Sequence, residues 1–474
     1  MTKLNQWRPT ATSFVLCIAT AIAAHAQTFN TLMNFDGANG VRPNPLDQGT
    51  DGAFYGTTTY GGANGVGTIF RVTTAGAFAT LYSFLCTETN CGDGNQPFSG
   101  LILASDGNSY GATSAGAYGT GGTIFRFNPA NKLMTLHTFD IFDGASPQAG
   151  LFQAFDGSLY GTTTSGGAKV EFGTVFKISP GGAFTTLYSF CAKTNCTDGA
   201  YPYAVMVQGP HGDLYGTTAG GGIRTATCGE HGCGTVFRIS TAGKLSTLYR
   251  FSSPGGWGPY AGLIQATDGN LYGTTALGGN SNCSGGCGTI FKISPGDALT
   301  TLYDFSGPDG DSPVNLIQAT DGNLYGTTGG GGANGSGTVF EISPDGMLTT
   351  LHSFDIADGQ GPAGLLQATN GSFYGVTQIG GTAGDGTVFS LSTGLGQFVA
   401  FVRGSGKIGQ TGGILGQGLT GTTSVAINGT SATFTVVSDT FIEATVPAGA
   451  TTGYVTVTTP SGTLTSNVPF RVIP

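Results

Sequence analysis

Short apolar runs recur along the chain in groups of four. In one group they are "GLIQA" (262–266), "LYGTT" (271–275), "GTIFKIS" (288–294) and "LTTLYDF" (299–305). Each run is rich in β-branched and aromatic residues and is bounded by Gly, Asn, Asp or Pro, which is typical of β-strands. The segments "TDGN" and "SPGDA" between runs predict tight turns, because Asp-Gly accepts positive φ angles. Since no helical period extends over a useful length, the pattern predicts an all-β protein.

The group of four runs occurs seven times. The thirteen residues "LIQATDGNLYGTT" appear twice without change, and the Tyr-Gly step of the motif recurs at Tyr55, Tyr110, Tyr160, Tyr215, Tyr272, Tyr325 and Tyr374. Self-similarity at a period of roughly fifty residues is typical of propellers and solenoids. Four antiparallel strands in each of seven copies predict a seven-bladed β-propeller over residues 27–394.

The seventh copy has no good fourth strand. The segment "FNTLMNF" (29–35), near the start of the chain, aligns with the fourth run "LTTLYDF" of another copy. We therefore predict that this N-terminal strand completes the last blade and closes the propeller. Closure would remove the open edge strands that otherwise aggregate.

The repeat stops after Gly396. Short alternating runs follow, with turn residues at Asn428-Gly429, at Pro447-Ala448-Gly449 and at Pro460-Ser461-Gly462. This pattern predicts a small immunoglobulin-like β-sandwich over residues 395–474.

The repeat and the C-terminal segment each resemble a known family. The pieces "DGNLYGTT", "GTIFKISP" and "LTTLY" resemble the Gloeo/Verruco (GloVer) tandem repeat of exported bacterial proteins, over about residues 29–392. That resemblance implies a secreted or surface location and a propeller-like repeat, and it implies no established reaction. The C-terminal pieces "ATVPAG" and "GYVTVTTPSGT" are similar to the IPT/TIG family, although "FVAFVRGSGKIG" departs from its usual first strand. An IPT/TIG domain implies a spacer or adhesion module.

The N-terminus has the features of an export signal. Lys3 and Arg8 precede an apolar stretch at 11–23, and Ala24-His25-Ala26 offers a cleavage site, so residues 1–26 are predicted to be a signal peptide. The alternative, a membrane anchor, is disfavoured because the stretch is shorter than the ~20 residues of a spanning helix. We expect a monomer, secreted or at the cell surface, with no transmembrane segment after cleavage.

Charge is sparse in this chain. Only 9% of the 474 residues are charged, and the formal net charge is −9. Nucleic acids and anionic membranes require a basic patch, and the sequence has no cluster of Lys and Arg, so neither is expected as a partner.

Eight cysteines remain after the predicted signal, and they lie in pairs four or five residues apart: Cys86 and Cys91, Cys191 and Cys196, Cys228 and Cys233, Cys283 and Cys287. An even number in an exported chain predicts disulfides. Zinc bound by two such pairs is the alternative, which an oxidising compartment disfavours. The spacing does not decide whether neighbours pair or loops are cross-linked.

The predicted strand order places every one of these cysteines in loops at one face of the propeller. These loops also vary most between copies, so we expect a ligand there. The aromatic candidates for binding it are Trp257, Tyr260, Tyr201 and Tyr203. The alternative is that the disulfides only protect long loops from proteolysis.

Metal and catalytic residues are not predicted. Glu230 and His231 form the only polar cluster with metal-binding character, and one Glu with one His is a weak signal. Asp-Gly steps follow most fourth strands, at Asp36, Asp93, Asp143, Asp198, Asp309 and Asp358. They could form a calcium-binding ring of carboxylates, but ordinary turn chemistry is the favoured interpretation, so no cofactor is predicted.

Three functions fit these observations. The favoured one is an exported binding or adhesion scaffold that recognises carbohydrate or a cell-surface protein. The second is a polysaccharide hydrolase or lyase with two carboxylates near the propeller axis. The third is a purely structural envelope protein.

Overall fold

A computed structural model describes residues 27–86, 91–116, 121–128, 130, 132–253 and 255–473. The predicted signal peptide, residues 1–26, lies outside the described residues. Apart from two 3-10 turns at Thr194–Cys196 and Gly229–His231, every element is a β-strand, which confirms the all-β prediction. Within the described ranges, no helix is both long enough and apolar enough to cross a lipid bilayer.

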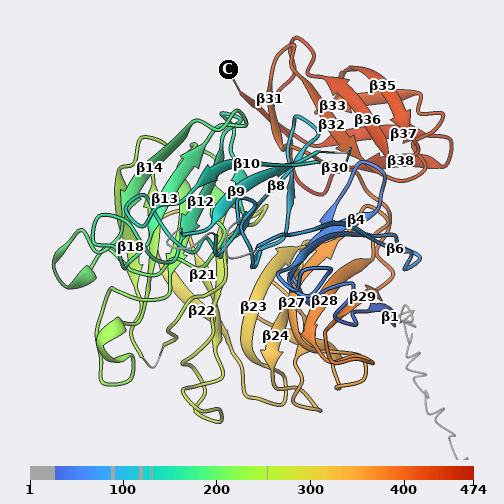
Figure 1. The fold of residues 1–474 in the computed structure, drawn as a ribbon. Helices are drawn as coiled ribbons and strands as arrows, with labels where there is room; N and C mark the ends of the chain where they lie inside the picture. Colours follow the sequence, from blue (N-terminus) through green and yellow to red (C-terminus); the bar gives the residue numbers. More distant parts are fainter. Residues whose placement is uncertain are drawn as a thin grey trace, which may run out of the picture.

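Seven antiparallel sheets, numbered here in chain order, account for most of the molecule (Figure 1). Sheet 1 contains β2 (Val41–Pro43), β3 (Asp47–Gln48), β4 (Phe54–Tyr60), β5 (Thr68–Val72) and β6 (Phe78–Ser83). Sheet 2 contains β7 (Ile102–Leu103), β8 (Ser109–Thr113), β9 (Thr123–Phe127) and β10 (Leu133–Thr138), and sheet 3 contains β11 (Phe152–Gln153), β12 (Leu159–Thr163), β13 (Thr174–Ile178) and β14 (Phe184–Ser189). Sheet 4 contains β15 (Val207–Gln208), β16 (Leu214–Thr218), β17 (Thr235–Ile239) and β18 (Leu245–Arg250).

The remaining three sheets repeat this order. Sheet 5 contains β19 (Ile264–Gln265), β20 (Leu271–Thr275), β21 (Thr289–Ile293) and β22 (Leu299–Asp304). Sheet 6 contains β23 (Asp311–Gln318), β24 (Leu324–Gly330), β25 (Thr338–Ile342) and β26 (Leu348–Ser353). Sheet 7 contains β27 (Gln360–Gln367), β28 (Phe373–Ile379), β29 (Thr387–Ser392) and, from the other end of the chain, β1 (Thr28–Asn34).

The N-terminal strand pairs as the sequence predicted. Strand β1 runs antiparallel to β29, with Phe29 opposite Leu391 and Asn34 opposite Thr387. In Figure 1 the blue β1 lies beside the orange β29. The chain therefore uses its first described strand to cover the free edge of its seventh sheet.

Buried apolar residues join each sheet to the next. Seven clusters each combine side chains from two consecutive sheets, and one of them brings Phe54 and Phe70 of sheet 1 against Tyr374 and Val388 of sheet 7. Both faces of every sheet are thus covered. Packing of this kind supplies the main stabilisation, at about 25 cal/mol for each Å² of apolar surface buried.

The repeated thirteen residues hold a sheet together and attach it to its neighbour. The hydroxyl of Tyr272 donates to Oδ2 of Asp268 in the turn, at 2.7 Å. The hydroxyls of Thr275 and Thr289 lie 2.9 Å apart between the second and third strands. Thr274 donates to the carbonyl of Pro313 in the next sheet, at 3.2 Å. Buried polar groups must be paired in this way, so the motif serves the fold.

The C-terminal strands form three further sheets. Strands β30 (Ala400–Phe401), β32 (Thr411–Leu415), β36 (Phe441–Thr445) and β35 (Thr433–Ser438) make one, and β34 (Thr430–Ser431), β33 (Ser424–Ile427), β37 (Val455–Thr459) and β38 (Gly462–Thr465) make another. A parallel pair joins β31 (Ser405–Lys407) to β39 (Arg471–Ile473). Residues of these strands share one buried core, which includes Ile414, Ile442 and Val457.

The C-terminal sheets contact the turns between the first and second strands of the seven-sheet part. Thr440 donates to the carbonyl of Thr50 at 2.7 Å, and Gln417 donates to the hydroxyl of Thr369 at 3.2 Å. The Arg471 guanidinium lies 4.8 Å from the ring centre of Phe155. Because strands run antiparallel, these turns lie at the opposite end of the sheets from the cysteine-bearing loops.

Candidate functional site

Four disulfides lie in loops at one end of the sheets. They link Cys86 to Cys91, Cys191 to Cys196, Cys228 to Cys233 and Cys283 to Cys287. The first two follow fourth strands, and the last two connect second strands to third strands. The predicted disulfides are confirmed, and each one joins sequence neighbours.

At this end of the sheets, a proline lies within the first strand of each sheet or five residues before it. Each proline packs against a positive-φ glycine of the preceding sheet, where a Cβ would come within about 3 Å of the proline ring. The seven pairs are Pro43 with Gly386, Pro97 with Gly67, Pro147 with Gly122, Pro202 with Gly173, Pro259 with Gly234, Pro313 with Gly288 and Pro362 with Gly337. These contacts hold the residue that follows each proline at an equivalent position in every sheet.

The seven residues that follow the prolines surround a central cavity of about 420 Å³. They are Asn44, Phe98, Gln148, Tyr203, Tyr260, Val314 and Ala363. The backbone places them alike, but their side chains differ from sheet to sheet. The fold therefore does not explain their identities, and differences of this kind are expected where a rigid scaffold presents a ligand site.

Two of the predicted aromatic residues meet on the wall of this cavity. The ring centres of Tyr203 and Tyr260 are 5.4 Å apart, with an interplanar angle of 59°. Tyr260 is 48% exposed. Burial raises the pKa of Tyr203, so its hydroxyl stays protonated at neutral pH and can donate a hydrogen bond.

Amide groups supply further polar contacts at the cavity. Asn44 is committed to the fold, because it donates to the carbonyl of Pro97 at 2.7 Å. Gln148 and Gln378 also line the cavity, and their side-chain amides make no hydrogen bond within the described part of the chain. Among the described lining residues there is no Asp, Glu, His, Lys or Arg. The wall thus combines aromatic rings with uncharged donors and acceptors.

Tyr201 lies in a different hollow. This second cavity, about 180 Å³, is lined by Glu171, Arg224, Glu230 and His231 as well. The Tyr201 hydroxyl donates to Oε1 of Glu171 at 3.3 Å, and burial together with that carboxylate raises the pKa of Tyr201. Within the described ranges, no three His, Cys, Asp or Glu side chains are grouped to hold a metal ion.

Trp257 differs from the expectation of an exposed platform. It is half-buried and packs against the core between sheets 4 and 5, next to Phe251 and Leu263. Its indole nitrogen is buried and makes no hydrogen bond to described residues. The reason is local pairing, because the backbone of Trp257 bridges to Leu277 in the neighbouring loop and holds the ring against the core.

Five of the six Asp residues of the Asp-Gly steps contact their own outer strands, and Asp36 instead accepts from the backbone N–H of Asn39 in its turn. Tyr82, Tyr188 and Tyr303 donate to Asp93, Asp198 and Asp309. Where the repeat has histidine, the ring nitrogen of His137 lies 2.9 Å from Asp143, and that of His352 lies 2.8 Å from Asp358. Burial lowers the pKa of His137 despite this carboxylate. These side chains satisfy the turns of separate sheets, as the turn interpretation predicts.

Sequence reasoning predicted a ligand at these loops but did not include Gln148 and Gln378, which line the cavity. A usable signal was present in the sequence. The position after each proline holds seven residues of six types, whereas the proline itself is present in every copy. Variation at a structurally constant position identifies the cavity wall.

Comparison with known proteins gives a family and a fold. Residues 21–228 and 223–437 match the family model of the Gloeobacter/Verrucomicrobia repeat. No curated protein matches the chain in sequence.

Two crystal structures of virginiamycin B lyase from Staphylococcus aureus resemble the protein, and one of them is a catalytically inactive variant with quinupristin. They superpose with TM-scores of 0.53 and 0.51 at 15% identity, covering 77% of this chain and 99% of theirs. At this identity the likeness concerns the fold alone.

Proposed function

Because the chain belongs to the Gloeobacter/Verrucomicrobia repeat family, we propose that it is an exported binding protein that holds an uncharged glycan at the cysteine-bearing end of a seven-bladed β-propeller. The seven antiparallel sheets, six of four strands and one of five, support this architecture together with the β1–β29 pairing and the contact between sheets 7 and 1. The predicted repeat family agrees with the match to the family model.

The central cavity carries the functional part of the proposal. Tyr203 and Tyr260 present two adjacent rings, and Gln148 and Gln378 present amides with unused donors and acceptors. Sugars bind proteins through stacking of their C–H faces on aromatic rings and through hydrogen bonds to their hydroxyls. The cavity volume of about 420 Å³ lies within the range of small-molecule sites.

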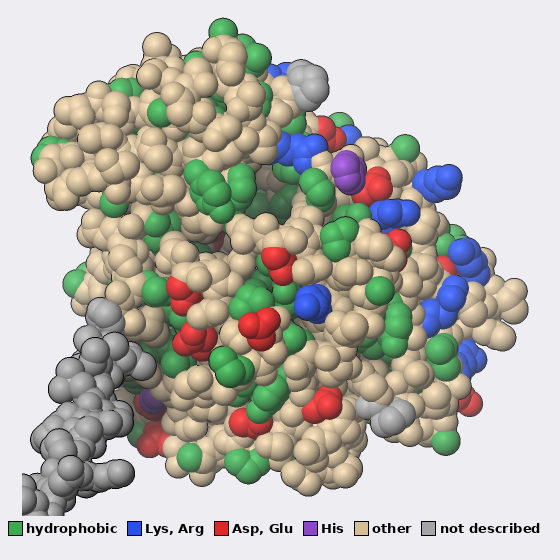
Figure 2. Space-filling model, turned by 180° about the vertical axis from the view of Figure 1, so that it is seen from behind, with side chains coloured by type: hydrophobic (Ala, Val, Ile, Leu, Met, Phe, Trp, Pro, Cys, Tyr) green, Lys and Arg blue, Asp and Glu red, His purple; other side chains and the backbone are tan. Residues whose placement is uncertain are grey.

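An uncharged ligand fits better than a charged one. The described lining residues of the cavity carry no ionisable group other than tyrosine hydroxyls, so they offer no counter-charge. The surface in Figure 2 is mostly uncharged, with basic side chains mainly toward one edge. Binding is favoured over hydrolysis for the same reason, because retaining and inverting glycosidases place two carboxyl groups beside the scissile bond.

The remaining assignments are proposed on sequence grounds. Residues 1–26 are the signal peptide, residues 27–394 form the propeller, and residues 395–474 form an IPT/TIG immunoglobulin-like sandwich that acts as a spacer. The shared core of the C-terminal sheets supports the last assignment. The mature protein acts as a monomer, secreted or at the cell surface.

The test is a glycan array combined with a polysaccharide depletion assay on residues 27–474. We expect retention of one class of neutral glycan, no new reducing ends, and a loss of about tenfold in affinity for Tyr260→Ala. The matched control is Tyr454→Ala, because Tyr454 is 45% exposed but lies in the C-terminal sheets. Release of reducing or unsaturated ends would favour the hydrolase or lyase alternative, and failure to bind any glycan would contradict the proposal.

A further inference from the structure

The contact between sheets 1 and 2 breaks the repeat at three positions. Asp47 stands where the other six sheets have an apolar residue opposite the motif tyrosine: Ile102, Phe152, Val207, Ile264, Ile317 and Leu366. Leu103 stands where the other sheets have glutamine. Ser109 stands where the others have Leu or Phe at the start of the second strand. All three changes meet at a single junction.

Two of these changes remove contacts that the other junctions have. At five junctions a glutamine accepts a hydrogen bond from a backbone N–H of the preceding sheet, as Gln318 does from Thr267 at 2.8 Å. Leu103 has no such acceptor. In the other sheets the residue at the position of Ser109 is a Leu or Phe that is buried between sheets, as Leu159 and Leu324 are.

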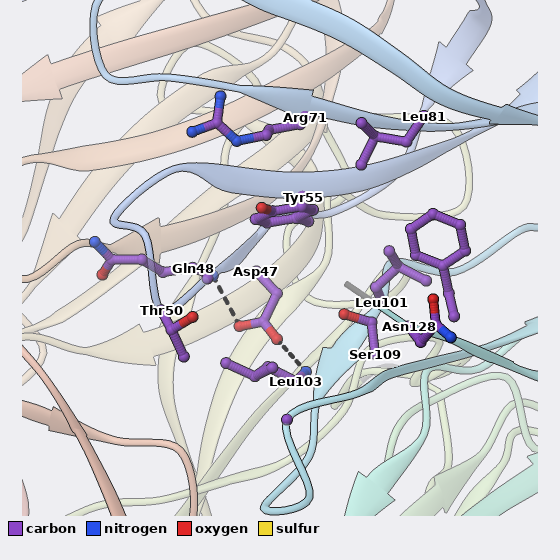
Figure 3. Close-up of a pocket in the computed structure, with 13 residues that line it drawn as sticks. Asp47, Gln48, Thr50, Tyr55, Arg71, Leu81, Leu101, Leu103, Ser109 and Asn128 are labelled. Carbon is purple, nitrogen blue, oxygen red and sulfur yellow. Dashed lines mark hydrogen bonds between the residues drawn. The ribbon is translucent and has the colours of Figure 1, made fainter. Parts of the chain in front are cut away.

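A cavity of about 280 Å³ lies where the larger side chain is missing (Figure 3). Asp47 and Tyr55 line it from sheet 1, and Leu101, Leu103, Ser109 and Phe127 line it from sheet 2. One water needs about 10–15 Å³ of such space, so the cavity is far larger than one bridging water requires. At the other junctions a buried Leu or Phe side chain occupies the position of Ser109.

Asp47 has no cationic partner in this cavity. Its Oδ1 accepts from the backbone N–H of Gln48 at 2.9 Å, and its Oδ2 accepts from that of Leu103 at 2.6 Å. Within the described part of the chain it makes no ion pair, because Arg71 at the rim pairs with Asp51 at 2.6 Å instead. A buried carboxylate without a counter-charge is costly, and a ligand that supplies the charge recovers that cost.

The walls determine what the rest of the ligand must be. Leu81, Leu101, Leu103 and Phe127 give the cavity apolar lining in addition to the carboxylate. Sheet 2 contributes no ionisable side chain to the described lining, and sheet 1 contributes only Asp47, Tyr55 and Arg71. The one unpaired charge is therefore negative.

We propose that this cavity binds a small protonated amine with a short apolar arm, whose ammonium pairs with Asp47 and whose arm contacts the leucines and Phe127. The site extends from the first strands of sheets 1 and 2 toward the turns at the other end of the sheets, and Leu101 lines both this cavity and the central one. The amine proposal does not depend on the proposed glycan function. It also shares Thr50, Leu103 and Gly107 with the cleft beneath the C-terminal sheets.

The experiment is calorimetric titration of residues 27–474 with three probes of similar shape. They are 2-phenylethylamine, 2-phenylethanol and 3-phenylpropionate, at about pH 7.5, where the amine is a cation and the acid an anion. We expect the amine to bind at least about tenfold more tightly than the alcohol, and the acid not to bind.

Two variants test the geometry: one removes the charge, and the other restores the residue type that most other sheets have at the start of the second strand. Asp47→Asn removes the charge and should lower amine affinity by about tenfold or more. Ser109→Leu should abolish binding of both amine and alcohol by filling the space. Asp213→Asn, at a surface carboxylate of sheet 4 that lies 3.8 Å from Arg238, is the control and should bind like the unmodified protein.

Near-ultraviolet circular dichroism shows whether each variant is folded. If one variant misfolds, the other still tests the proposal. Equal affinity for amine and alcohol would overturn the proposal, as would unchanged amine binding by Asp47→Asn. A crystal soaked with the amine that shows only ordered water between Asp47 and Phe127 would also overturn it.

Discussion

Pro43 packs against Gly386 and so joins the first sheet to the last. Gly386 has a φ of +104°, and a Cβ atom placed on it would lie 2.6 Å from Cδ of Pro43. The six other junctions between consecutive sheets contain the same pair of residue types. The same proline–glycine contact, repeated seven times, thus determines how closely each sheet packs against the next.

Replacing Gly386 with alanine should destabilise the protein by about 3 kcal/mol, because the residue would meet both an unfavourable φ and the proline ring. Urea unfolding followed by fluorescence measures this change. Gly404→Ala is the control, because Gly404 has no positive φ and no atom near its Cβ position. The control should stay within about 0.5 kcal/mol of the unmodified protein. An equal effect of both substitutions would show that the proline contact is unimportant.

Removal of residues 27–35 should expose the edge of β29 and lower the melting temperature. Strand β1 pairs along the whole of β29, and Phe35 is fully buried between sheets 7 and 1. An exposed strand edge recruits other chains, so we also expect self-association in size-exclusion chromatography. A protein that begins at residue 27 is the comparison. A truncated protein that stays monomeric and melts at the same temperature would contradict the role of β1.

The stability should depend on pH through Asp47. Protein atoms surround its carboxyl group, although the residue keeps some surface toward the cavity, and this burial raises the pKa of Asp47 to about 6. Because the folded-state pKa lies above the unfolded value, the favourable contribution is complete below about pH 4 and is lost as the pH rises through about 6. The loss should be on the order of 2 kcal/mol, allowing for water in the cavity.

The measurement is the free energy of unfolding between pH 4 and pH 7, compared with Asp47→Asn. The difference between the two proteins should change by this amount over the window, and Asp213→Asn should follow the unmodified protein. Parallel profiles for Asp47→Asn and the unmodified protein would mean that the Asp47 carboxyl group has an ordinary pKa in the fold.

Removal of the Cys228–Cys233 disulfide should have a local effect. The bond closes a loop over a sequence separation of five, so on the chain-entropy model it contributes about 2 kcal/mol. In the double variant Cys228→Ala with Cys233→Ala, hydrogen exchange should rise mainly over residues 219–234. Exchange that rises equally in sheets 1 and 7 would show instead that this disulfide stabilises the whole fold.

Much of the fold was accessible from the sequence because the repeat is regular. The alternation of apolar and polar residues predicted the strands, and the spare strand "FNTLMNF" predicted the pairing of β1 with β29. Asp47 and Ser109 depart from the repeat in the sequence, but their separation of 62 positions does not indicate that they line one cavity. Trp257 was expected to be exposed because it lies in a loop. The sequence does not show that the neighbouring loop, which contains Leu277, pairs with it and holds its ring against the core.

The sequence by itself determined the strands, the repeat and the loop positions of the cysteines, because these depend on residues close along the chain and on a pattern written seven times. The structure decided that neighbouring cysteines pair. Only the tertiary structure showed that seven positions after the prolines share one cavity, and that Asp47, Leu103 and Ser109 meet at one junction. Those relationships join residues from different sheets, and side-chain contacts between sheets depend on how the sheets pack, which local sequence does not encode.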